Sequence, residues 1–196
     1  MKTLLFIVAL LLIQIELFAQ PCPLDYEGPS TVTIQICEGC SIQATWCCGT
    51  IASPVGNKPA IHFSDILLIG DCTFCLEWMQ HSNGHLVPSI PWERLIGAVV
   101  YSEEFCFDPT PELPPCNDPQ QAKYNMVVTN GGCYRLIQDM ETKRYVPCSA
   151  GVQELCYEEY IICYEIINGL SNLKVEGLGK LPSFTCADPN CFPLCN

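Results

Sequence analysis

Two Cys-x-x-Cys motifs are the residues of this chain whose types and spacing could carry chemistry. Cys37 with Cys40 and Cys72 with Cys75 form the motifs, and His81 and His85 follow the second one. Thiolates and imidazoles at such spacings could form a redox centre or a zinc site. However, a redox motif normally opens a helix, and the gap before His81 is too short for the common zinc finger. Disulfide bonding is the expected role of these cysteines, and no metal or other cofactor is predicted.

The cysteine content supports this expectation. The chain has 16 cysteines in 196 residues, a density typical of exported disulfide scaffolds. The count is even, but the sequence alone does not give the connectivity. Cys47 and Cys48 are expected to bond different partners, because neighbours in a strand point to opposite faces. The cysteines predicted to form disulfides are Cys22, Cys37, Cys40, Cys47, Cys48, Cys72, Cys75, Cys106, Cys116, Cys133, Cys148, Cys156, Cys163, Cys186, Cys191 and Cys195.

The first residues are typical of a secretory signal peptide. A basic start at Lys2 precedes an apolar run over 4–15, and the small residue Ala19 offers a cleavage point. We therefore expect residues 1–19 to be removed; an uncleaved anchor is the alternative, although the apolar run is short for a membrane span. The segment resembles the signal peptides of secreted bacterial proteins, which implies nothing about activity. The mature protein is expected to be secreted, either to the extracellular space or to the periplasm and cell envelope, and to have no membrane span.

The charge balance argues against two classes of partner. The chain has 9 Lys and Arg against 21 Asp and Glu, a net charge of −12. Binding to a phosphate backbone or to an anionic membrane surface needs clustered basic residues. Nucleic acid is therefore not an expected partner. The expected partner is an unknown extracellular ligand or envelope component.

Alternating apolar residues predict strands over 31–37, 41–47 and 60–69. A three-residue loop, Glu38-Gly39-Cys40, is expected between the first two, because it pairs Ile36 with Ile42 and keeps both apolar sets on one face. A substantial helix is predicted near 90–103. Ser89 is its expected cap, and its apolar stripe consists of Trp92, Leu95, Ile96, Val99 and Val100.

Further strands are predicted in the second half of the chain. Residues 123–129 and 133–139 flank Asn130-Gly131-Gly132, which indicates a hairpin between them. Residues 156–167 favour a strand on β-propensity, although a helical stripe is the alternative, and 172–176 could return as its partner. The expected fold is mainly β (α+β is possible), built of short antiparallel strands and hairpins with about one substantial helix and many disulfides.

A proline-rich segment over 108–121 divides the cysteines evenly, with eight before it and eight in or after it. Such a segment is typical of a stiff, extended connection. The predicted organisation is a disulfide-rich β half over 20–107 with the helix, the connection, and a disulfide-rich β half over 122–196. One domain over 20–196 is the alternative.

Tyrosines and carboxylates are the remaining candidate site residues. Tyr157, Tyr160 and Tyr164 alternate with glutamates and could present a binding face, because the tyrosine ring is large, rigid and amphipathic. The adjacent acids Glu103-Glu104 and Glu158-Glu159 do not imply the separation that hydrolysis of glycosides needs. No catalytic residue is predicted.

The sequence thus favours a secreted, disulfide-stabilised, non-catalytic module for adhesion, ligand binding or a structural role. Whether the chain is an enzyme is left open. One alternative is a small secreted hydrolase with a site of scattered carboxylates and His81 or His85. Another is a disulfide-rich toxin or inhibitor.

Overall fold

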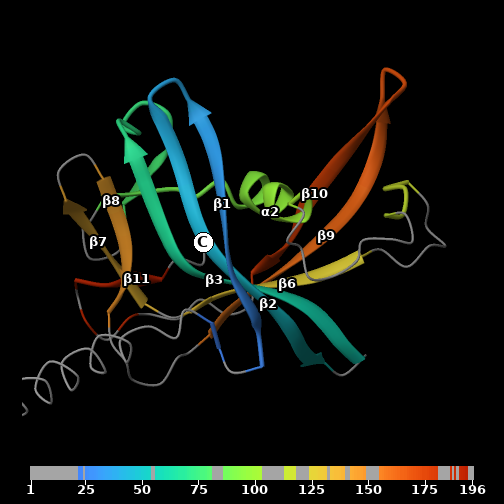
Figure 1. Cartoon of the computed structure of the whole chain (residues 1–196), viewed down its shortest axis with the longest axis horizontal. Coiled ribbons are helices and arrows are strands. Elements are labelled where there is room, and N and C mark those ends of the chain that lie inside the picture. The colour runs from blue at the N-terminus through green and yellow to red at the C-terminus, as the bar shows by residue number, and fades with distance from the viewer. Residues whose placement is uncertain are drawn as a thin grey trace, which may run out of the picture.

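The computed structural model of the chain is mainly β, with one α-helix among the residues it describes (Figure 1). The described residues are 22–23, 25–53, 56–80, 86–102, 113–117, 124–131, 133–139, 142–148, 155–180, 186, 188 and 190–193. Their elements are β1 (Glu27–Cys37), β2 (Cys40–Ser53), β3 (Gly56–Gly70), β4 (Trp78–Gln80), β5 (Leu86–Pro88), α2 (Trp92–Val100), β6 (Tyr124–Gly131), β7 (Cys133–Asp139), β8 (Thr142–Pro147), β9 (Leu155–Ile167), β10 (Leu170–Lys180) and β11 (Phe192–Pro193). The predicted fold class, a disulfide-rich and mainly β fold with one helix, is confirmed, although several strands are longer than expected.

Nine strands form one sheet around β3, which divides it into two arms. On one edge, β3 pairs along its length with β2, which in turn pairs with β1. On its other edge, residues 60–63 of β3 pair in parallel with β6, whereas residues 66–69 pair antiparallel with β8. One arm therefore continues from β3 through β6 to β9 and β10, and the other through β8 to β7 and β11 (Figure 1).

The sheet and the disulfides relate the two halves of the chain differently. β1 to β3 come from the first half and β6 to β11 from the second, yet hydrogen bonds join all of them in one sheet. Among the described residues, five of the six bridges between identified partners join cysteines of one half, and Cys116–Cys163 joins the proline-rich segment to the second half. The predicted division into 20–107 and 122–196 stays a prediction, and most of segment 108–121 lies outside the described residues.

The predicted loop of the first hairpin was wrong by one residue. The turn contains only Glu38 and Gly39, and Cys37 pairs with Cys40. Nevertheless, Ile34 lies opposite Ile42, because the register shifts between Gln35 and Cys37. A β-bulge inserts one extra residue into a strand. The bulge at Ile36 thus keeps the apolar side chains on one face, which the longer loop was expected to do.

The predicted hairpin between 123–129 and 133–139 was also wrong. Both strands form, as β6 and β7, but they belong to different arms of the sheet: β6 pairs with β3 and β9, and β7 with β8 and β11. The Asn-Gly signal favours a hairpin locally, but each strand pairs with partners that are distant in the sequence. The strand over 156–167 is confirmed as β9, and β10 returns beside it after Asn168-Gly169.

Helix α2 lies between β1 and β10, with which it is in contact (Figure 1). Its predicted apolar stripe is buried against Trp46, Phe63 and other core residues of the sheet. The expected cap was wrong, because the helix begins after Pro91 without a side-chain cap and the backbone N–H of Ser89 donates to the carbonyl oxygen of Glu77. α2 therefore fills the space between the first strand and the end of one arm.

None of the helical residues that the structure describes forms a segment long and apolar enough to cross a membrane.

Candidate functional site

The two Cys-x-x-Cys motifs lie side by side, at the same end of the β2–β3 hairpin. The first motif encloses the turn between β1 and β2, and the second follows the end of β3. The pairing of Cys40 with Gly70 fixes this arrangement, because it places the start of β2 opposite the end of β3. Gly39 and Gly70 come so close that a side chain on Gly70 would collide with the carbonyl oxygen of Gly39. The two motifs are therefore held by regular backbone pairing.

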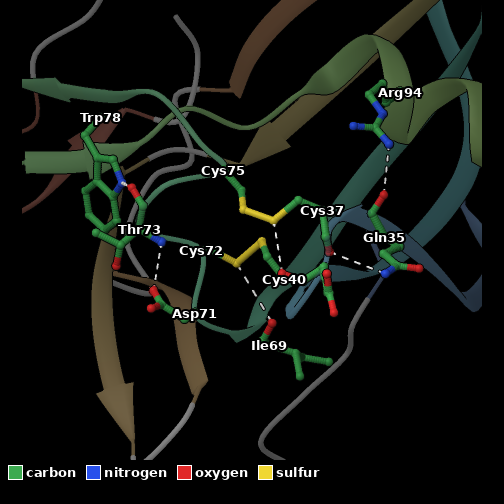
Figure 2. Close-up of a disulfide and its surroundings, with 11 residues drawn as sticks. Gln35, Cys37, Cys40, Ile69, Asp71, Cys72, Thr73, Cys75, Trp78 and Arg94 are labelled. Atoms are coloured by element: carbon green, nitrogen blue, oxygen red, sulfur yellow. Dashed lines mark hydrogen bonds between the residues drawn. A yellow bond between two sulfur atoms is a disulfide. The ribbon is translucent and has the colours of Figure 1, made fainter.

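Two disulfides join the motifs to each other (Figure 2). Cys37 bonds Cys75, and Cys40 bonds Cys72. Cys40 and Cys72 are buried, whereas Cys37 and Cys75 are half-buried. The sulfur atoms of Cys37, Cys40 and Cys75 all lie within 4.8 Å of one another. The two bridges thus bring these four cysteines together, and we call them the four-cysteine cluster.

The loop that carries the second motif is ordered by its own hydrogen bonds. The carboxylate of Asp71 accepts from the backbone N–H of Thr73 at 3.0 Å, and the indole N–H of Trp78 donates to the carbonyl oxygen of Thr73 at 3.1 Å (Figure 2). The hydrogen bonds from Thr73 lower the pKa of Asp71, because they stabilise its charged form. On the other side, Arg94 donates to the carbonyl oxygen of Gln35 at 2.9 Å. These contacts fix the loops around the cluster.

The remaining bridges with identified partners lie outside this cluster. Cys22 bonds Cys47, and Cys48 is bonded in a disulfide of its own, so the adjacent pair has different partners. Three further bridges are Cys116–Cys163, Cys133–Cys186 and Cys148–Cys191. No free cysteine occurs within the described part of the chain. The side chains of Cys106, Cys156 and Cys195 lie outside it, so their bonding stays a prediction.

The predicted tyrosines do not lie together on one open face. Tyr160 is 2% exposed and belongs to the core, where its hydroxyl donates to Glu158 at 2.7 Å. Burial, and then the hydrogen bond to Glu158, raise its pKa well above the usual range. Tyr164 is half-buried, and the side chain of Tyr157 lies outside the described residues. β9 is also an inner strand of its arm, between β6 and β10, so the tyrosine binding face stays a prediction without support.

The adjacent acids of β9 are directed to separate partners. Glu158 accepts from Tyr160, whereas Glu159 forms an ion pair with Lys58 at 2.7 Å. Alternating side chains of a strand point to opposite faces, which explains why the two carboxylates diverge. Such an arrangement does not place them across one cleft, as two-carboxylate hydrolysis requires.

In the described part of the chain, no candidate site is built from the histidines or from the acidic pair Glu103-Glu104. His62 is buried in β3, beside the ring of Tyr26 at 6.2 Å between centroids. His81, His85, Glu103 and Glu104 lie outside the described residues, so the hydrolase alternative stays untested at those positions. Cys72 and Cys75, the other members of the zinc alternative, are bonded to Cys40 and Cys37.

Sequence reasoning missed an exposed apolar surface at the end of the β9–β10 hairpin. β6 pairs with β9 as far as Ile162, and the segment around Pro115 continues this edge at Tyr164. Beyond Tyr164, the described residues form a two-stranded ribbon that projects from its arm (Figure 1). Ile166 and Leu170 are each 70% exposed, and Ile167 is 49% exposed. We call these three residues the hairpin tip. The sequence signal that could have identified this surface is the Asn168-Gly169 turn, which has aliphatic residues on both sides. In a regular alternating pattern, some of these positions would be polar.

The turn itself makes the hairpin tip a defined structure. Asn168 and Gly169 both have positive φ, 52° and 80°, as a two-residue type I′ turn requires. Ile167 lies directly opposite Leu170 across this turn. The aliphatic side chains are therefore displayed by a regular hairpin.

Comparison with models of known protein families, with curated proteins and with solved structures finds no match for this chain.

Proposed function

We propose that the chain is a secreted, non-catalytic module that binds a protein partner of the extracellular space or cell envelope through its hairpin tip. The observation that carries this proposal is the exposure of Ile166, Ile167 and Leu170 on a ribbon that projects from the sheet. Exposed apolar surface lowers the solubility of a protein unless a partner covers it, so such patches commonly mark interaction sites.

The disulfides support the location. Cytosolic reductants keep thiols reduced, whereas bridges form and persist outside the cytosol. Six bridges between described cysteines therefore fit an extracellular or envelope protein.

The chemistry of the hairpin tip favours a protein over a membrane or a polysaccharide. A net charge of −12 disfavours approach to an anionic membrane. The three residues of the hairpin tip are aliphatic, and their branched side chains would pack into an apolar pocket of a protein partner. Glu165 lies in the same hairpin, so basic residues at the border of the partner's pocket would complement it.

Photo-cross-linking from the hairpin tip tests the proposal. A photoreactive amino acid at position 166 of the oxidised protein should give one protein adduct in the envelope fraction of the producing cell. Excess wild-type protein should compete for this adduct, whereas the variant with Ile166→Ser and Leu170→Ser should compete at least tenfold less well. The matched control is the same group at Phe74, which is 93% exposed in the loop after β3.

Three results would overturn the proposal: equal labelling from positions 74 and 166, undiminished competition by the serine variant, or binding to protein-free lipid vesicles. A panel of glycans, peptides and esters completes the test. Turnover of any of them by the oxidised protein, lost on substitution of one acidic or histidine residue, would show an enzyme instead.

A further inference from the structure

We propose that the four-cysteine cluster has a second state: once its two disulfides are reduced, Cys37, Cys40, Cys72 and Cys75 bind one zinc ion. This inference is independent of the proposed function. It rests on the arrangement of the sulfur atoms and on the backbone that holds them.

The two bridges hold the sulfur atoms close enough together for one metal ion. Zinc bound by four thiolates is tetrahedral with Zn–S distances of about 2.3 Å, which places neighbouring sulfur atoms about 3.8 Å apart. The sulfur atoms of Cys37, Cys40 and Cys75 already lie within 4.8 Å of one another. Cys72 is the fourth, since its sulfur is bonded to that of Cys40 in the oxidised protein. Reduction frees the bonded sulfur atoms to separate to the zinc spacing, and rotation of the Cys72 side chain would bring the fourth sulfur to the ion.

The motifs also supply the local geometry that a tetrathiolate site uses. Two Cys-x-x-Cys motifs, each contributing a pair of thiolates, are the usual donors of structural zinc sites. In the sequence the motifs are far apart, with Cys40 and Cys72 separated by 32 positions. The pairing of β2 with β3 removes this distance, because it holds the start of one strand against the end of the other. The site would therefore stand on paired strands, which keep its ligands in place.

The different burial of the two bridges provides a route to the reduced state. Cys37–Cys75 is the half-buried bridge, and a dithiol reductant can reach it first. The thiolate of Cys75 can then attack the sulfur of Cys40, which lies within 4.8 Å. A Cys75–Cys40 bond forms, the Cys40–Cys72 bond breaks, and its electron pair remains on Cys72 as a thiolate. A second equivalent of dithiol reduces the new bridge.

The conversion of the two disulfides to a zinc tetrathiolate needs only the dithiol and the zinc ion. Two dithiol equivalents supply four electrons and four protons, and each becomes a cyclic disulfide. Zinc binding then displaces the four thiol protons. Both states cross-link the same two loops, with two disulfides in one and one metal ion in the other.

Cobalt and zinc binding to the full-length chain tests this inference. The protein is reduced with a phosphine, and Co²⁺ alone is added. We expect one equivalent to bind with the absorption spectrum of a tetrahedral tetrathiolate, and one equivalent of Zn²⁺ to abolish that spectrum. Cys37→Ser and Cys72→Ser should each weaken cobalt binding at least 100-fold. The matched control is Cys116→Ser, which removes a thiol outside the cluster and should leave cobalt binding within threefold of wild type.

Alkylation of the wild-type protein provides a second measurement that needs no variant. After reduction, Zn²⁺ should protect Cys37, Cys40, Cys72 and Cys75 from iodoacetamide, while the other cysteines react, as peptide mass spectrometry would report. The inference would be overturned if protection were absent or spread over other cysteines. Equal loss of cobalt binding in the Cys116 variant, or a spectrum with fewer than four thiolates, would also contradict it.

Discussion

Lys58 on β3 forms an ion pair with Glu159 on β9, with 2.7 Å between the ammonium nitrogen and the carboxylate oxygen. β6 lies between these strands in the sheet, so the pair reaches across a neighbouring strand. The side chains are 17% and 33% exposed, which makes this pair less screened by water than a surface pair. It joins the central strand directly to the second strand of its arm.

Removal of this pair should destabilise the protein. We expect a double-mutant cycle with Lys58→Ala and Glu159→Ala to give a coupling free energy of about 1 kcal/mol in urea unfolding. The exposed pair Lys174–Glu176, within β10, is the control, and its coupling should stay below about 0.5 kcal/mol. Equal coupling in both cycles would contradict a special role for the Lys58 pair.

Two buried tyrosines should make the protein unstable in alkali. Burial raises the pKa of Tyr145 and of Tyr160 above the ordinary value of about 10, so both stay protonated in the folded state. Above pH 10 the unfolded chain loses these protons and the folded chain keeps them, so the unfolding free energy falls as pH rises. Each tyrosine should contribute a slope of up to about 1.4 kcal/mol per pH unit.

Urea unfolding between pH 8 and 11 measures this slope. Tyr145→Phe and Tyr160→Phe should each reduce it, while their stabilities at pH 8 should fall by about 1 kcal/mol because one hydrogen bond is lost. The hydroxyl of Tyr145 donates to the carbonyl oxygen of Pro88, and that of Tyr160 to Glu158. A slope unchanged in both variants would show that other groups cause the alkaline instability.

The twin bridges of the four-cysteine cluster should not contribute additively to stability. Either bridge alone holds the two loops together, so replacing one pair of cysteines by alanine removes only a short additional loop. Replacing both pairs releases the whole loop, whose ends are separated by 32 or 38 positions. The loss on removing both should therefore exceed the sum of the two separate losses by about 1 kcal/mol.

Guanidinium unfolding of the two single-pair variants and of the combined variant checks this expectation. The Cys116–Cys163 pair provides the comparison, since it joins β9 to a segment outside the cluster and its removal should add to that of Cys37–Cys75. Additive losses within the cluster would mean that the two bridges constrain the unfolded chain independently.

Gly70 should be far less replaceable than Gly169. Both have positive φ, 82° and 80°, where a side chain costs about 1 kcal/mol. At Gly70 a Cβ would also collide with the carbonyl oxygen of Gly39, whereas nothing lies within 4 Å of a Cβ at Gly169. We expect Gly70→Ala to cost about 3 kcal/mol or more and Gly169→Ala about 1 kcal/mol. Comparable melting temperatures of the two variants would argue against the close approach.

Local signals in the sequence predicted several elements correctly. The 3.6-residue period of Trp92, Leu95 and Ile96 identifies α2, because that period places them on one face. The residues of β9, followed by Asn168-Gly169, likewise predict a strand and its return.

Pairing between distant strands could not be predicted in the same way. Asn130-Gly131 indicates a hairpin between β6 and β7. However, β6 pairs instead with residues 60–63 of β3, which lie far earlier in the chain. The bulge at Ile36 was equally hidden, since a longer turn would satisfy the same apolar pattern. The sulfur cluster depends on the register of β2 against β3, and the hairpin tip depends on where β6 and the segment around Pro115 stop pairing with β9. Neither property is contained in the spacing of residues along one segment.

The forked pairing of β3 has a consequence for synthesis and for truncated chains. β3 is made before β6 and β8, so the edge that carries Ile61, Phe63 and Leu68 has no hydrogen-bond partner in the nascent chain. Both Cys-x-x-Cys motifs are already present at that stage, so oxidation can lock β2 against β3 while the edge is still open. An open apolar edge is a template for pairing with another chain. A fragment that ends between β5 and β6 should therefore be well cross-linked and yet prone to aggregate.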